Sequence, residues 1–93
     1  MELKDYREQI DRIDEEIVRL FQARMDVAAQ IAKYKKENRL PILHSQREQE
    51  KLTAVCGQAR EDMRPYLRTL YTLLFELSRA HQEKRSDGCL EDL

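Results

Sequence analysis

The chain has 93 residues, of which 38% are charged and 6% aromatic, with only two glycines and two prolines. This composition favours helix, and the length suffices for one small domain, so we predict a single all-helical domain. A net charge of −1 argues against a general nucleic-acid or membrane-surface binder. No apolar run approaches the roughly 18 residues of a transmembrane helix, and the opening MELKDYREQI lacks the apolar core of a secretory signal.

Cysteines and histidines do not form the clusters that metal sites require. Cys56 and Cys89 lack metal-ligand spacing, and His44 and His81 have no companion ligand residues. Two isolated thiols fit a reducing compartment. We therefore expect no metal site and a cytoplasmic protein.

The first predicted element is one helix from about residue 3 to about residue 37, a stretch without glycine or proline. Its apolar residues recur at alternating spacings of three and four, with one gap, at Leu3, Tyr6, Ile10, Ile13, Ile17, Leu20, Val27, Ile31 and Tyr34. At ~1.5 Å per residue the helix is roughly 50 Å long, whereas a compact domain of this size is roughly 30 Å across. The apolar stripe must be covered from outside, and a second copy of the chain is the simplest cover.

Asn38 and Pro41 are predicted to end this helix. A shorter helix follows from about residue 46 to about residue 59, and Ser45 and Glu48 before and within it match the S-x-x-E capping box. Its apolar positions are few, namely Leu52, Val55 and Cys56.

A charged connection over residues 60–64 leads to a third helix, with Pro65 in its first turn and an end near residue 84. This helix is the most hydrophobic part of the chain. The turn residues and charges after it predict a flexible tail over residues 86–93, which leaves residues 1–85 as the helical domain.

Polar residues stand where the helical patterns call for apolar ones. Arg24 falls on the apolar stripe of the first helix, and Lys35 points in nearly the same direction eleven residues later. On the third helix, Ser78 and Gln82 continue an apolar stripe. Each has an explanation without function. Arg24 could fix the register of paired helices, Lys35 could be a solvated surface lysine, and Ser78 and Gln82 could lie where the third helix leaves the core. Together with Arg47, however, they gather donors and cations that call for an anionic ligand such as a carboxylate or phosphate.

Arg7 lies about 25 Å along the helix axis from Arg24 and about 100° around it, so the two cannot serve one pocket within one chain. Arg7 is either a surface arginine or a residue that reaches the pocket of a partner chain. An antiparallel pairing of long helices would allow the second arrangement.

Three segments, YREQIDRIDEEIVRLFQARMDVAAQIAKYKKEN, LPILHSQREQE and LYTLLFELSRAHQ, closely resemble in this order the all-helical class of chorismate mutase, over roughly residues 3–83. The resemblance implies three-helix chains that intertwine as homodimers. It also implies an isomerase of the shikimate route to aromatic amino acids, which converts chorismate to prephenate by a Claisen rearrangement without a metal or organic cofactor.

The resemblance implies roles for individual residues as well. Arg7 matches an arginine that the partner chain lends to a substrate carboxylate, and Arg24 matches one that grips a carboxylate within its own chain. Lys35 and Gln82 match the two residues that hydrogen-bond the breaking ether oxygen. These matches make Arg24, Lys35 and Gln82 the candidate catalytic residues.

Further positions belong to the implied substrate pocket or to the loop before the second helix. Arg47 matches a pocket arginine of the second helix, Glu48 the carboxylate that takes the substrate's ring hydroxyl, and Ser78 a serine near a carboxylate. His44 departs from the family, which commonly has aspartate there, and Ser45 stands where proline is frequent. The departure concerns how this loop meets the substrate.

Two other functions fit the same residues. An isochorismate pyruvate-lyase on the same scaffold would use similar cations on a closely similar dianion. A helical dimerisation module without catalysis would treat Arg24 as a register residue, and Arg24→Leu would then stabilise the dimer.

Overall fold

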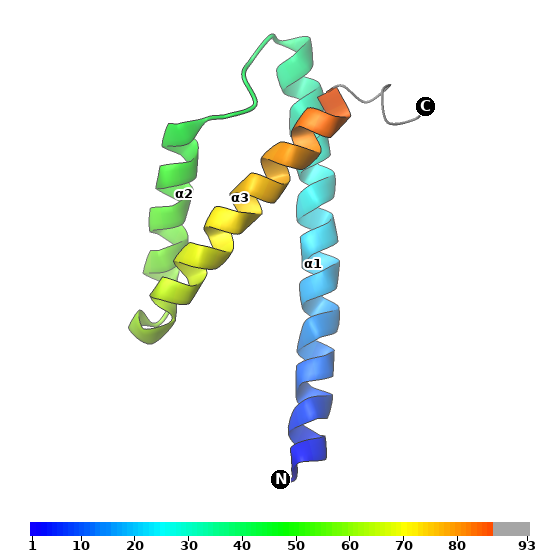
Figure 1. The fold of residues 1–93 in the computed structure, drawn as a ribbon, viewed down its shortest axis with the longest axis vertical. Coiled ribbons are helices and arrows are strands. Elements are labelled where there is room, and N and C mark those ends of the chain that lie inside the picture. Colours follow the sequence, from blue (N-terminus) through cyan, green and yellow to red (C-terminus); the bar gives the residue numbers. More distant parts are fainter. Residues whose placement is uncertain (87–93) are drawn as a thin grey trace.

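The computed structural model describes residues 1–86, with side chains described up to residue 84. Helix α1 spans Leu3–Glu37, α2 spans Ser45–Gln58, the short 3-10 helix η1 spans Glu61–Met63 and α3 spans Arg64–Ser86 (Figure 1). The prediction of three helices with a very long first one is confirmed. The charged connection forms η1, which was not expected, and Ser86, the first residue of the predicted tail, still belongs to α3. Residues 87–93, with Cys89, lie outside the described residues.

Helix α1 ends in a Schellman motif just after Glu37, where the sequence predicted its end. Arg39 adopts a positive φ of 56°. The Leu40 N–H donates to the Lys35 carbonyl at 2.7 Å, and the Arg39 N–H donates to the Lys36 carbonyl at 3.3 Å. These two bonds satisfy carbonyls that the last helical turn leaves unpaired. The motif turns the chain sharply away from α1 and toward α2 (Figure 1).

The start of α2 differs from the prediction. Its N-cap residue is His44, and no side chain caps the helix. The predicted capping box of Ser45 and Glu48 is therefore wrong. Ser45 is already the first helical residue, and the Glu48 carboxylate instead accepts hydrogen bonds from Arg79 of α3. In this arrangement the carboxylate pairs with a full positive charge, whereas in a capping box it would bond only a backbone N–H.

Helix α3 packs against both α1 and α2, while α1 and α2 have no comparable contact within the described residues. Figure 1 shows α3 crossing the C-terminal half of α1, while the N-terminal half extends away from the other helices. Few apolar residues are buried in the part of the chain whose side chains are described, namely Ala28, Ala32, Leu52, Val55 and Cys56. Small side chains at 28 and 32 allow α3 to approach α1 closely.

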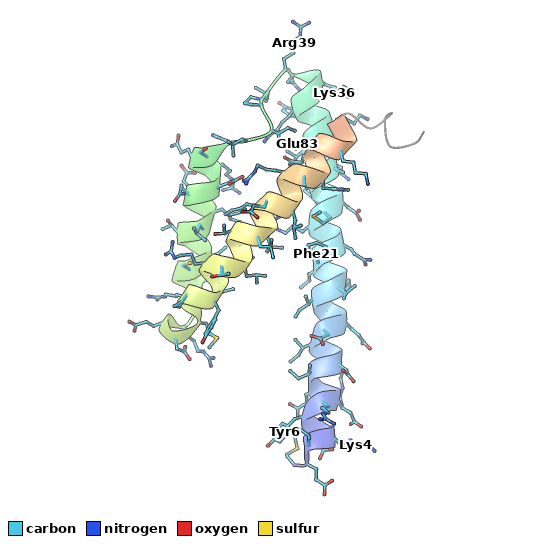
Figure 2. All side chains as sticks on the ribbon, in the orientation of Figure 1. Lys4, Tyr6, Phe21, Lys36, Arg39 and Glu83 are labelled. Carbon is cyan, nitrogen blue, oxygen red and sulfur yellow. The ribbon has the colours of Figure 1, made fainter. Side chains whose placement is uncertain are left out.

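The apolar stripe of α1 is uncovered in the single chain. Its predicted members, from Leu3 to Tyr34, are each between 41% and 61% exposed. Tyr6, labelled in Figure 2, lies on the part of α1 that extends away from α2 and α3. The radius of gyration is 16.6 Å, against about 12 Å for a compact chain of this length. Monomeric proteins rarely expose so extended an apolar surface.

Within residues 1–86, no helix combines the length and the hydropathy that a membrane-spanning segment requires.

Glycine at position 39 is expected to stabilise the fold. Arg39 is exposed and carries its Cβ in the left-handed region, which costs about 1–2 kcal/mol for a residue with a Cβ. Because glycine also gains freedom in the unfolded chain, we expect Arg39→Gly to raise the free energy of unfolding by about 1 kcal/mol. Urea denaturation with an unchanged m-value measures this. Arg39→Ala, which keeps the Cβ, is the control, and an equal gain in both variants would contradict the explanation.

Candidate active site

A cavity of about 550 Å³ lies where α1, α2 and α3 meet the segment that precedes α2. Its size is typical of a site for a small molecule. The cavity is lined by most of the residues that the sequence singled out: Arg24, Lys35, His44, Arg47, Glu48, Ser78 and Gln82. These residues come from three helices and from positions up to 58 residues apart, so packing of the helices brings them together.

Arg24 reaches across from α1 to α3. Its Nη1 donates a hydrogen bond to the Ser78 Oγ at 2.5 Å. Its guanidinium carbon lies 5.9 Å from the ring centroid of Tyr71 and 6.0 Å from that of Phe75. Aromatic faces attract a cation at this range, and a planar guanidinium held between them keeps a fixed direction. None of these partners is an anion, so the positive charge of Arg24 is not neutralised by them.

Lys35 joins the end of α1 to the segment before α2. Its Nζ donates to the carbonyl oxygen of Ile42 at 2.7 Å, and the side chain is half-buried. An ammonium has three donors, so two remain for a ligand in the cavity. The bond to a neutral carbonyl fixes the direction of Lys35 and leaves its charge uncompensated.

Gln82 is 7% exposed and is the one buried polar side chain among the described residues. No described group forms a hydrogen bond with its amide. Among the described residues, every side-chain nitrogen or oxygen that solvent cannot reach does have a hydrogen-bond partner. The Gln82 amide must therefore open onto the cavity that it lines. A buried amide without a partner is costly unless a ligand satisfies it.

Arg47 and Lys51 lie one turn apart on α2, and both line the cavity. Neither has an acidic partner among the described residues. Two like charges four residues apart on a helix destabilise it slightly. A bound anion would remove this repulsion. Lys51 was not predicted from the sequence.

Glu48 is the one acidic residue that lines the cavity, as far as the described residues show. Nη1 of Arg79 donates to both carboxylate oxygens, at 2.6 Å and 2.5 Å. The side chains are 28% exposed for Arg79 and 25% for Glu48. Arg79 was not predicted from the sequence. Its position four residues after Phe75 and three before Gln82 places it on the same face of α3, and this spacing could have revealed it.

Arg7 does not line the cavity. It is exposed on the N-terminal part of α1, which extends away from α2 and α3 (Figure 1). The expectation that Arg7 cannot serve the pocket of its own chain agrees with this placement. His44, the N-cap residue of α2, does line the cavity beside Arg47 and Glu48.

The cavity is strongly cationic. Arg24, Lys35, Arg47, Lys51 and Arg79 line it, against the single carboxylate of Glu48. Ser78 is the one hydroxyl-bearing residue among the described residues of the lining. It accepts a hydrogen bond from Arg24, and no described histidine or carboxylate bonds to it. Within the described residues, no group of three His, Cys, Asp or Glu side chains could hold a metal ion. Such a lining can bind a small dianion and donate hydrogen bonds to it, and it holds no paired nucleophile and base.

Comparison with known proteins agrees with this chemistry. The chain is 49% identical over 49 residues to the bifunctional chorismate mutase/prephenate dehydratase of Aquifex aeolicus, a match that covers 53% of this chain and 14% of that protein. It is 41% identical over 46 residues to the T-protein of Haemophilus influenzae, which covers 50% of this chain and 12% of that protein. The chain therefore matches only a small part of these longer relatives. No solved structure matches it. The model of the family described as chorismate mutase type II matches residues 6–83, so this chain belongs to the chorismate mutase type II family.

Proposed function

We propose that this chain catalyses the Claisen rearrangement of chorismate to prephenate in the cavity between α1, α2 and α3. The observation that carries the proposal is the cavity's excess of cations around an unpartnered buried amide, in a member of this family. Chorismate carries two carboxylates and an enol ether. The cations can take the carboxylates, and the amide can take the ether oxygen.

The reaction class explains why the lining suffices. A pericyclic rearrangement breaks one bond and forms another within the same molecule, so it requires no nucleophile and no proton transfer. The protein must hold the substrate in its compact reactive conformer. It must also donate hydrogen bonds to the ether oxygen as negative charge develops there.

Fixed donors suit the second task. We assign the ether oxygen to Lys35 and Gln82, and the substrate carboxylates to Arg24 and Arg47. Lys35 is already oriented by the Ile42 carbonyl, and Gln82 is held in a buried position with its amide unpaired. Donors that are in place before the reaction lower the barrier because they need not reorganise during it.

We propose further that the active form is an intertwined homodimer. The uncovered stripe of α1 supports this, as do Leu70, Leu73 and Leu77 on α3, which are 39% to 49% exposed. Burying apolar area is the main driving force for association. In such a dimer the extended N-terminal half of α1 would carry Arg7 to the partner's cavity, where it would bind a substrate carboxylate.

We also infer a cytoplasmic reaction that needs no metal or organic cofactor. A pericyclic step redistributes electrons within the substrate and involves no net oxidation or reduction, so the proposed mechanism requires no cofactor. Cys56 is a buried free thiol, which suits a reducing compartment.

The direct test supplies the purified chain with chorismate and, in parallel, with isochorismate. We expect prephenate from chorismate at a rate far above the uncatalysed one. Pyruvate release from isochorismate, without prephenate from chorismate, would instead indicate the isochorismate pyruvate-lyase. Turnover of neither substrate would leave the chain as a dimerisation module.

Removing the amide of Gln82 is expected to slow the chemical step. Losing one preorganised donor typically costs ~2.7–4 kcal/mol of barrier, so Gln82→Ala should lower kcat by on the order of a hundredfold or more. The dimer should remain folded, as circular dichroism and size-exclusion chromatography can check. Gln58→Ala, at an exposed glutamine outside the cavity, is the matched control. Near-normal turnover in Gln82→Ala would remove Gln82 from the catalytic residues.

Mixing two inactive variants tests whether Arg7 acts on the partner chain. In a heterodimer of Arg7→Ala with Lys35→Ala, one site carries both changes and the other carries neither. Joint unfolding and refolding of equal amounts should therefore restore about a quarter of wild-type activity, because half of the dimers are mixed. A mixture of Arg24→Ala with Lys35→Ala, which both act within one cavity, should restore none. Equal failure of both mixtures would show that Arg7 does not cross between chains.

A further inference from the structure

Glu48 is held by a residue of another helix. Nη1 of Arg79 bonds both oxygens of its carboxylate, which ties α2 to α3 at the wall of the cavity. About three quarters of each side chain is shielded from solvent. Partial shielding makes this pair stronger than an exposed one, which typically contributes little.

Without Arg79, Glu48 would have competing partners on its own helix. Lys51 lies three residues later on the same helix face and lines the cavity without a carboxylate partner among the described residues. The uncapped N-terminus of α2 also attracts a negative charge in its first turn. Either interaction would draw the Glu48 carboxylate away from Arg79. It would then occupy hydrogen-bond donors of the cavity that the proposed function reserves for the substrate.

From this geometry we propose that Arg79 is a positioning residue, which keeps the Glu48 carboxylate where it can accept a hydrogen bond from the substrate's ring hydroxyl. The inference rests on the proposed function. Each carboxylate oxygen that accepts from Arg79 retains a lone pair for a hydroxyl. The same carboxylate repels the substrate's own carboxylates, so it also fixes which way round the dianion binds.

Arg79 also fixes the position of the Glu48 carboxylate relative to the Gln82 amide. It lies three residues before Gln82 on α3, so the two residues share one rigid helical face. Because Arg79 holds Glu48 from this face, the Glu48 carboxylate, which accepts from the hydroxyl, keeps a fixed position relative to the Gln82 amide, which donates to the ether oxygen. Glu48 alone, on α2, would follow any small movement between the two helices.

A double-mutant cycle separates this positioning role from direct substrate binding by Arg79. We expect Arg79→Met to raise KM for chorismate about tenfold, as for the loss of a charge-assisted hydrogen bond, with a smaller change in kcat because Lys35 and Gln82 remain. Arg79→Lys should recover part of the loss. In the Glu48→Gln background, Arg79→Met should change KM less than twofold. Arg68→Met removes an exposed arginine from the same helix outside the cavity and should leave both constants unchanged.

An equal rise in KM in both backgrounds would show that Arg79 contacts the substrate itself, and no rise in either would deny it a role. The thermal midpoints of the same four proteins give a second readout that needs no turnover. If Arg79 fixes Glu48, the two single changes should not add in the double variant, because they remove one interaction. If the wild type does not convert chorismate, the proposed function fails. The positioning role has its own test: shifts in thermal midpoint that add in the double variant would overturn it.

Discussion

Positive charge without carboxylate partners gathers around one cavity, and it determines what this site can bind. Arg24, Lys35, Arg47 and Lys51 line it without a carboxylate partner among the described residues. Where two of these cations are anchored, their partners are neutral: a hydroxyl for Arg24 and a backbone carbonyl for Lys35. Neutral acceptors orient a cation and leave its charge available. Because half-buried cations without an anion are costly, this lining favours the binding of an anion.

Helix α1 serves the fold and the proposed site at once. Its C-terminal half packs against α3 and carries Arg24 and Lys35, while its N-terminal half extends away from the other helices and carries Arg7 (Figure 1). The uncovered apolar stripe runs along both halves. Within residues 1–84, the five buried apolar residues form only a small hydrophobic core. Association of two chains would cover the apolar stripe of α1 and, in the same step, bring the proposed Arg7 contact to the partner's cavity. In the proposed dimer, stability and the proposed activity would therefore depend on the same association.

Local patterns predicted the helices because each depends on nearby residues. The stretch free of glycine and proline sets α1, and Asn38 lies at its end as expected. Arg24, Ser78 and Gln82 could be found as breaks in apolar stripes, because a helix repeats its faces regularly. The bond between Glu48 and Arg79 could not be found in this way. It joins two helices, so it depends on how α2 and α3 pack, and it replaced the capping box that local sequence favoured.

The most direct measurement of the central claim is calorimetric titration of the purified chain with a bicyclic dicarboxylate that mimics the rearranging ether, beside its monomethyl ester. The ester keeps the bicyclic core and removes one negative charge. We expect one dicarboxylate bound per chain and binding of the ester weaker by on the order of a hundredfold, because a shielded cation loses its partner. Equal affinity for the two compounds, or no binding of the dicarboxylate, would contradict the account.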